Sequence, residues 1–150
     1  MGLERFHEAQ RHDYDRALRE IENGRKTSHW MWYIFPQLKG MGRSYISQYY
    51  AIDSFAEAKE YLNDPILSMR LVHISEALLK LGGRDPVRIF GETDAQKLRS
   101  CMTLFSLVTD HILVFDKVLD QYFHGSRCQF TVQAFQKELH FQPKKPEETV

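Results

Sequence analysis

Helix boundary signals recur along this 150-residue chain and predict where most of its helices begin and end. Residues 54–57 and 93–96 have capping-box spacing, in which Ser or Thr is followed three residues later by Glu or Gln. Residues 64–65 and 85–86 are Asp-Pro pairs, which combine an N-cap residue with a proline at the first helical position. Glycines, which commonly end helices, follow the apolar stripes at Gly24, Gly82, Gly83, Gly91 and Gly125.

Apolar side chains recur at helical spacing between these signals. Helices are predicted over residues 3–23, 54–62, 65–81, 93–108, 112–123 and 130–139, with short helices or turns at 28–36, 45–50 and 86–90. Asp13 is an alternative N-cap that would split the first helix in two. No pair of alternating strands joined by an Asn-Gly or Asp-Gly turn occurs. We therefore expect an all-α fold, an irregular multi-helical single domain of about six to eight helices, some of them short.

A chain of this length fits one domain with its own hydrophobic core. We expect this single helical domain to span residues 1–141. From Gln142 onward the sequence lacks apolar periodicity and is rich in proline, lysine and glutamate. Residues 142–150 are therefore expected to form a mobile C-terminal tail.

Composition and charge argue against several classes of function. Lys plus Arg and Asp plus Glu both number 20, and the pI is about 7.1, so no overall field attracts nucleic acid or an anionic membrane. Cys101 and Cys128 form neither a CxxC pair nor a disulfide framework. No signal peptide and no membrane-spanning apolar run is recognisable. We expect a soluble cytoplasmic protein that binds neither nucleic acid nor membrane, and its oligomeric state stays open.

The segment 28–37, Ser-His-Trp-Met-Trp-Tyr-Ile-Phe-Pro-Gln, contains both tryptophans and is the first candidate for a site. Ser28 is predicted to cap a short helix that Pro36 would stop, which places His29 where the helix dipole favours a neutral imidazole. One interpretation makes the rings core side chains. The other has one or two rings lining a cleft in which polar neighbours orient a ligand. The candidate ligand-binding residues here are His29, Trp30, Trp32 and Gln37.

Two basic segments supply further candidates. Glycines space the segment 40–44, where Arg43 and the predicted N-cap Ser44 could form an anion site at the start of a helix over 45–50. An ordinary connecting loop is the alternative, because the glycines match neither a dinucleotide fingerprint nor a P-loop. On the helix 93–108, Lys97 or Arg99 could hold a carboxylate or phosphate, Arg by a bidentate fork and Lys as a point charge, or both could be solvated.

Other chemistry has little support in the sequence. The seven histidines lack zinc spacing, and no acidic triplet resembles a calcium loop, so we expect no metal and no cofactor. Cys101 lies in an apolar stripe and is expected to be a buried core thiol.

Several motifs together resemble one known family. They are Leu-Glu-Arg-Phe at 3–6, Gly-Arg-Lys at 24–26, Ser-His-Trp-Met-Trp at 28–32, Phe-Pro-Gln at 35–37, Gly-Arg-Ser at 42–44, Ile-Phe-Gly at 89–91 and Lys-Leu-Arg-Ser-Cys-Met-Thr-Leu-Phe at 97–105. In this order they resemble a bacterial family known only as Domain of Unknown Function 1810, over residues 3–123. The resemblance implies an all-helical fold and no established activity. The name calpastatin, sometimes given to such proteins, has no support in these residues.

Two functions of different classes follow from these candidates. The first is a site that binds or transforms a small anionic metabolite, carboxylated or nucleotide-like, where the two basic segments meet the aromatic segment. The second is an interaction module in which an exposed aromatic patch receives a partner protein's helix or tail. A pocket that joins the aromatic segment to the Arg43 loop would favour the first function, and a flat apolar patch the second.

Overall fold

The computed structural model describes residues 2–140, and within this range the chain forms nine helices. They are α1 (Glu4–Glu22), α2 (Met31–Ile34), α3 (Tyr45–Tyr49), α4 (Phe55–Asn63), α5 (Pro65–Lys80), α6 (Pro86–Phe90), α7 (Glu92–Leu107), α8 (Val114–Phe123) and α9 (Gln129–His140). No strand occurs in the described residues, where sheet-like pairing is limited to an isolated parallel bridge between Leu38 and Ile52. The predicted all-α class is confirmed, with one helix more than the expected six to eight.

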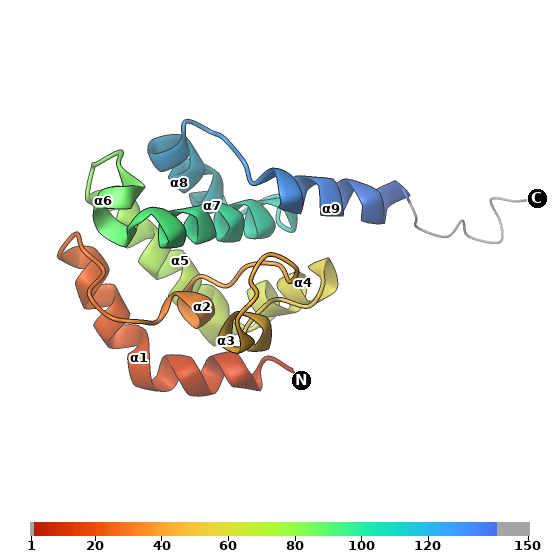
Figure 1. Cartoon of the computed structure of the whole chain (residues 1–150), viewed down its shortest axis with the longest axis horizontal. Coiled ribbons are helices and arrows are strands. Elements are labelled where there is room, and N and C mark those ends of the chain that lie inside the picture. The colour runs from red at the N-terminus through yellow and green to blue at the C-terminus, as the bar shows by residue number, and fades with distance from the viewer. Residues whose placement is uncertain (1, 141–150) are drawn as a thin grey trace, which may run out of the picture.

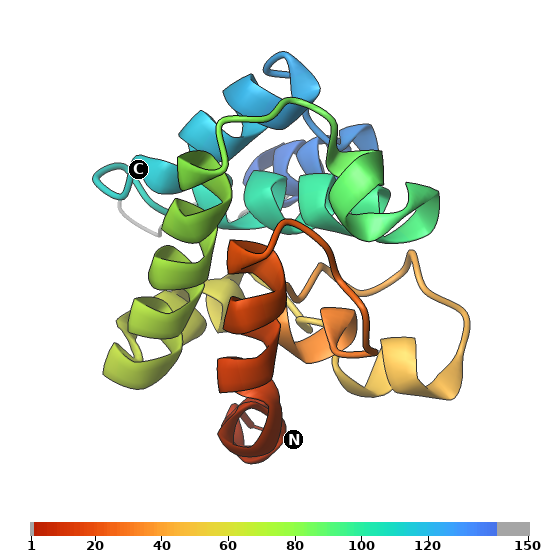
Figure 2. The same ribbon diagram turned by 90° about the vertical axis from the view of Figure 1, so that its left-hand side faces the viewer.

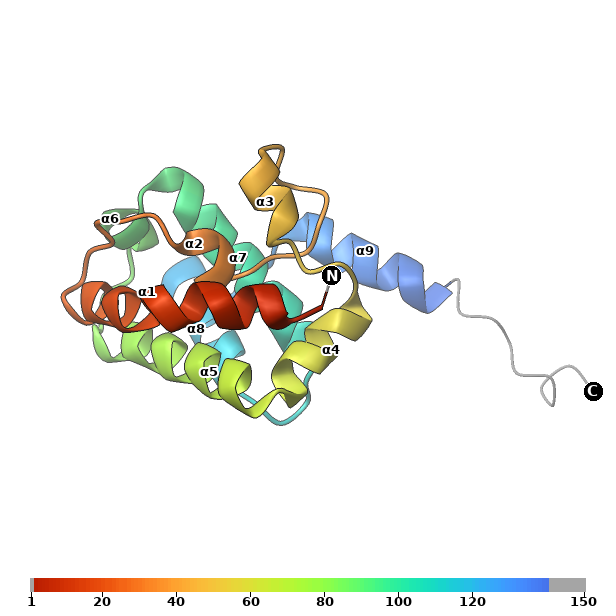
Figure 3. The ribbon, with the colours of Figure 1, turned by 90° about the horizontal axis from the view of Figure 1, so that it is seen from below.

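The helices form two tiers that α5 connects. Figure 1 shows α6, α7, α8 and α9 on one side and α1, α2, α3 and α4 on the other. In Figure 2, α1 and α5 run side by side, in agreement with their close packing. Figures 1 and 3 both show α9 extending beyond the other helices at one end of the molecule. The helix α7 packs against α4, α6, α8 and α9, so it lies at the centre of this arrangement.

The core follows from the burial of α7 and the aromatic side chains around it. Six consecutive residues, 100–105, are buried on α7, together with Ala95 and Leu98. The Phe105 ring lies 5.1 Å from Tyr61 of α4 and 5.9 Å from Phe115 of α8, measured between ring centroids. Tilted ring contacts of this kind add to the free energy gained by burying the rings. The core is therefore continuous from α4 through α7 to α8.

Four predicted helix caps are confirmed. In each, a side-chain oxygen accepts a hydrogen bond from a backbone N–H of the first turn, which satisfies a donor that the helix itself leaves open. These caps are Ser44 for α3, Ser54 for α4, Asp64 for α5 and Asp85 for α6.

The predicted start of the helix at the Thr93–Gln96 capping box is wrong. The helix α7 begins at Glu92, and the N-cap is Gly91, whose φ of 81° lies in the left-handed region that favours glycine. The Gly91 carbonyl accepts the first backbone hydrogen bond, from the Ala95 N–H at 3.0 Å. Because Gly91 both ends α6 and begins α7, Thr93 falls inside the helix and has no cap to make.

The alternative split of the first helix at Asp13 does not occur. The helix α1 is continuous from Glu4 to Glu22, and Asp13 lies in its middle. Its carboxylate accepts hydrogen bonds from Tyr33 and Arg16 instead of capping backbone N–H groups. Asp13 therefore acts as a hydrogen-bond acceptor for Tyr33, 20 residues further along the chain, and not as a helix cap.

Two further expectations concern the C-terminal tail and membrane-spanning helices. The predicted tail, residues 142–150, lies outside the described residues, so the boundary of the domain stays a prediction. Among residues 2–140, the helices are all too short or too polar to cross a membrane.

Hydrogen bonds from the Arg5 side chain connect α1 to the end of the segment that precedes α4. Its side chain is buried, with 6% of the residue exposed. Its Nε donates to the Tyr49 carbonyl at 2.9 Å, and Nη2 donates to the Ala51 carbonyl at 2.8 Å and to Glu57 Oε1 at 2.9 Å. Nη1 donates to the Gly2 carbonyl at 2.5 Å. A buried guanidinium is stable in such a place because its donors have acceptors.

We predict that Arg5→Met lowers the free energy of unfolding by about 3–5 kcal/mol, because it removes the ion pair with the largely buried Glu57 carboxylate and leaves the Tyr49 and Ala51 carbonyls without this donor. Chemical denaturation measures this loss. The control is Arg127→Met, which removes an ion pair with Asp116 in which both side chains are about half exposed. This control should lose less than about 1 kcal/mol. Equal losses in the two variants would contradict a structural role for Arg5.

Candidate functional site

A cavity of about 430 Å³ lies between the segment 37–47 and the exposed face of α7. Its lining comes from three parts of the chain: the segment 37–47, the first half of α7, and the loop before α9. The lining residues are Gln37, Met41, Gly42, Arg43, Ser44, Ser47, Thr93, Gln96, Lys97, Arg99, Ser100 and Cys128. We call this cavity the basic pocket.

The wall from α7 follows from helical periodicity. Thr93, Gln96, Lys97 and Ser100 are three, four and seven residues apart, so they share one face of the helix. The opposite side of α7 carries core residues such as Leu98 and is buried. The pocket therefore lies on the polar side of a helix that is otherwise covered.

The opposite wall is a glycine-containing loop that leads into α3. Ser44 caps this helix by accepting from the Ser47 N–H at 3.2 Å. A Cβ added at Gly42 would lie 2.4 Å from Ser47 Cβ, so only glycine lets the loop approach the helix here. Arg43 and Ser44, next to Gly42, also line the pocket.

Sulfur contacts join the two walls. Met41 Sδ lies 3.5 Å from Ser100 Oγ of α7 and 3.8 Å from Cys128 Sγ in the loop before α9. The Cys128 backbone N–H also donates to Thr103 Oγ1 at 3.0 Å, which ties this loop to α7. Because methionine is unbranched and polarizable, Met41 fills the space between these elements.

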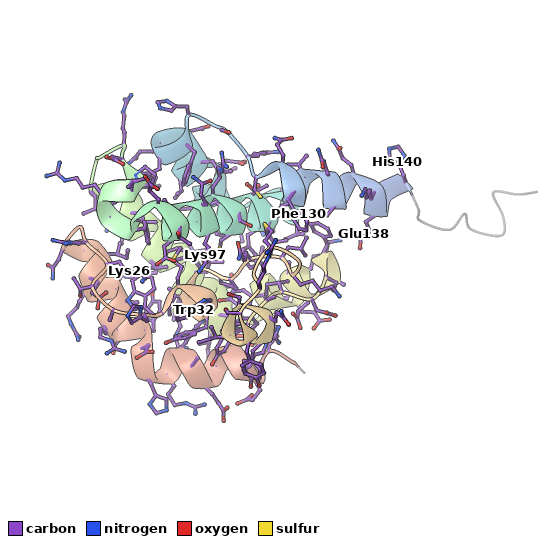
Figure 4. The ribbon with its side chains drawn as sticks, viewed as in Figure 1. Lys26, Trp32, Lys97, Phe130, Glu138 and His140 are labelled. Carbon is purple, nitrogen blue, oxygen red and sulfur yellow. The ribbon has the colours of Figure 1, made fainter. Side chains whose placement is uncertain are left out.

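The charges that line the basic pocket have one sign. Arg43, Lys97 and Arg99 are cationic, and the lining residues among those described include no carboxylate and no imidazole. Lys97 Nζ lies 3.5 Å from Asp94 Oδ1 and 5.4 Å from the centre of the Trp32 ring. Figure 4 shows Lys97 and Trp32 close to each other, between α7 and α2. These contacts hold the Lys97 ammonium group in place, and Lys97 remains part of the pocket lining.

Asp94, which contacts the pocket residue Lys97, is shared between two lysines. Asp94 Oδ2 lies 2.9 Å from Lys26 Nζ, in addition to the contact with Lys97. Only 9% of the Lys26 side chain is exposed, and its ammonium lies 5.2 Å from the centre of the Trp30 ring. One carboxylate is thus shared between two ammonium groups.

A second cavity of about 470 Å³ lies on the other side of the same loop. It shares Gln37, Gly42 and Ser47 with the basic pocket. Within the described residues its lining contains one charged side chain, Lys39, which pairs with Asp53 at 3.0 Å. We assign the candidate site to the basic pocket because its charged groups converge, although the second cavity is slightly larger.

The structure brings five of the eight sequence candidates together. Gln37, Arg43, Ser44, Lys97 and Arg99 line the basic pocket. Trp32 is half-buried and outside the lining, and its ring contacts the lining residue Lys97. Trp30 is fully buried, and His29 is exposed outside the pocket. Whether these residues bind a ligand stays a prediction.

The predicted cap at Ser28 is wrong because Glu20 binds this serine. Oε1 of Glu20 accepts from the Thr27 N–H at 2.7 Å and from Trp30 Nε1 at 2.9 Å, and Oε2 accepts from Ser28 Oγ. The helix α2 begins only at Met31 and has no side-chain cap. His29 therefore precedes the helix and does not lie at its start, where the sequence placed it.

Hydrogen bonding also changes the acidity of Glu20. Partial burial disfavours its charge, but the hydrogen bonds from Ser28, Thr27 and Trp30 outweigh this effect and lower its pKa to about 2. Cys101 differs because it is fully buried without such donors, and desolvation raises the pKa of its thiol well above the ordinary value. The expected core position of Cys101 is confirmed.

Seven lining residues were absent from the sequence candidates. They are Met41, Gly42, Ser47, Thr93, Gln96, Ser100 and Cys128, the last from the loop before α9. The helical spacing of residues 93, 96 and 100 relative to Lys97 would have found three of them. No local signal connects Cys128 to this site, because tertiary packing alone places its loop there.

Comparisons with known proteins give a family and a similar fold. A family model described as "Protein of unknown function (DUF1810)" matches residues 1–135. The crystal structure of the conserved hypothetical protein Rv1873 from Mycobacterium tuberculosis is similar, with 39% sequence identity and a TM-score of 0.86. The match covers 88% of this chain and 94% of that one. Among proteins with curated descriptions, none matches the chain significantly.

We predict that Trp30→Ala lowers the free energy of unfolding by about 3–5 kcal/mol, because it empties a fully buried site. His29→Ala, one residue away but exposed, should change it by less than about 0.5 kcal/mol. Thermal and chemical denaturation of both variants measure the contrast. A loss at His29 as large as that at Trp30 would show a structural role for this histidine that its exposure does not suggest.

We also predict a pH-dependent contribution from Glu20. Its pKa is lowered in the folded state, so the stability that it contributes is present above pH 4.5 and is lost as the pH falls from 4.5 toward 2. Glu20→Gln should therefore be less stable than wild type near neutral pH, and the difference should shrink over this acidic range. Chemical denaturation at several pH values measures it, with Glu22→Gln, exposed on the same helix, as the control.

Proposed function

The chain belongs to the DUF1810 family of proteins of unknown function, and we propose that it binds a small anionic metabolite, carboxylated or nucleotide-like, in the basic pocket. The volume of about 430 Å³ lies within the range of small-molecule sites. One wall comes from α7, which the core holds in place, and the other from the segment that leads into the capped start of α3.

The observation that carries this proposal is the convergence of Arg43, Lys97 and Arg99 without a lining carboxylate. Like charges that line one cavity repel one another, so a bound anion would stabilise a pocket of this composition. Arginine presents a planar fork to two oxygen atoms, while lysine contributes a compact point charge. Together these groups fit a carboxylate or a phosphate.

The uncharged lining suits the remainder of such a ligand. Hydroxyl groups come from Ser44, Ser47, Thr93 and Ser100, and amides come from Gln37 and Gln96. These groups can donate and accept hydrogen bonds, as recognition of a hydroxylated or heterocyclic ligand body requires. The lining offers no carboxylate or imidazole for general acid–base chemistry, so we propose binding as the function of the pocket.

A second candidate function, protein binding, has one observation in its favour. Tyr45 on α3 is 81% exposed and stacks on Tyr49, with 6.1 Å between ring centroids, and Ile46 beside them is 37% exposed. Exposed aromatic side chains are common at protein interfaces. This patch lies on α3 and differs from the segment 28–37, in which Trp30 is buried.

We predict that a thermal-shift screen against phosphorylated and carboxylated metabolites gives at least one ligand. At about 100 times its dissociation constant, a ligand adds about 2.7 kcal/mol of stability, which raises the melting temperature by several degrees. Arg43→Gln combined with Lys97→Gln should abolish this rise, because it removes two of the three positive charges.

The matched control is Lys39→Gln. Lys39 lies on the same segment but outside the basic pocket, and its pair with Asp53 is exposed. This variant should keep the full ligand-induced shift. A screen without hits, or hits that the double variant binds as well as wild type, would contradict the proposal and leave protein binding through α3 as the better candidate.

A further inference from the structure

Arg99 carries an unsatisfied donor inside the molecule. Its Nε is buried, and among the described residues it is the one buried side-chain nitrogen or oxygen without a hydrogen-bond partner. The guanidinium makes one hydrogen bond within these residues, from Nη1 to Ser126 Oγ at 3.3 Å. This bond is long for a charged donor. The Arg99 side chain also lines the basic pocket.

The state of Arg99 contrasts with that of Arg5. The donors of Arg5 find carbonyl and carboxylate acceptors at 2.5–2.9 Å, so the same fold can satisfy a buried guanidinium. Leaving a buried N–H without an acceptor is unfavourable, and in native proteins such groups are rare. A ligand that supplies the missing acceptor would explain why the Nε–H of Arg99 has no partner within the protein.

We propose that Arg99 is the specificity-determining residue of the basic pocket and selects ligands with two oxygen atoms on one carbon or phosphorus, a carboxylate or a phosphate. This inference rests on the proposed anion-binding function. The weak bond to Ser126 lets the guanidinium turn on binding, so that Nε–H and Nη2–H donate side by side to the two oxygens. Lys97, held by Asp94 and the Trp32 ring, contributes charge without this directional preference.

Isothermal titration of wild type and Arg99→Lys with inorganic pyrophosphate and with citrate tests this assignment. The lysine variant keeps the positive charge but loses the fork, so its affinity for the probe that wild type binds should fall about tenfold or more. Binding of pyrophosphate alone would identify a phosphate ligand, and binding of citrate alone a carboxylate. Arg127→Lys is the control, because Arg127 lies next to Ser126 but pairs with Asp116 outside the pocket, and it should bind as wild type does.

A second measurement separates this role from a structural one. Arg99→Met keeps most of the aliphatic volume and removes the unsatisfied N–H, so the ligand-free variant should melt about 2–4 °C above wild type while it loses the ligand-induced shift. A variant that melts below wild type would overturn the premise that this donor is unfavourable in the free protein.

The outcomes distinguish the two proposals. If wild type binds neither probe nor any other oxyanion, the proposed function fails, and the role of Arg99 fails with it. If wild type binds and Arg99→Lys binds equally well, the pocket still binds anions, and the assignment of specificity to Arg99 is overturned.

Discussion

The burial of α7 is the constraint on which the rest of the structure depends. Its core side chains meet α4 and α8 through Phe105, and α6 and α9 also pack against it. A helix with so many buried residues has one polar face left, and Thr93 and Lys97 occupy that face, with buried Ser100 beneath the pocket wall. The pocket therefore exists because the core takes up the other sides of this helix. A change that rotated α7 would move both the core contacts and the pocket wall.

Much of the fold could be predicted because most helix boundaries here are set by residues close together in the sequence. The caps Ser54, Asp64 and Asp85 act on backbone N–H groups two or three residues away, so spacing alone locates them. Prediction failed where a distant partner competed for the capping group, as Glu20 does for Ser28. At Thr93 it failed because Gly91, through its positive φ, had already begun the helix. Glu20 and Gly91 both lie outside the short capping motifs on which these two predictions were based.

The candidate site was predictable only in part, for a related reason. Arg43 stands beside a helix cap, and Lys97 stands at helical spacing, so each position followed from local sequence. Their convergence depends on the close contact of Gly42 with Ser47 and on Met41, which bridges to α7 and to Cys128. The dense aromatic segment suggested a ligand cleft, yet the burial of Trp30 shows that this ring belongs to the core. Aromatic density alone does not separate a core from a cleft.

The hydrogen bonds that hold the pocket loop determine which parts of the protein would lose conformational freedom when a ligand binds. The Ile52 N–H donates to the Gln37 carbonyl at 2.8 Å and the Lys39 N–H to the Ile52 carbonyl at 2.9 Å, which closes the segment on itself, and Arg5 holds the far end at Ala51. With the backbone held at these points, binding would restrict chiefly the long cationic side chains, at about 0.5–1.5 kcal/mol for each one immobilised. Lys97 is already fixed by Asp94 and Trp32, so most of that cost falls on the arginines. A preformed backbone with adjustable cations is an arrangement that recognises the charge and oxygen geometry of a ligand without requiring the loop to fold around it.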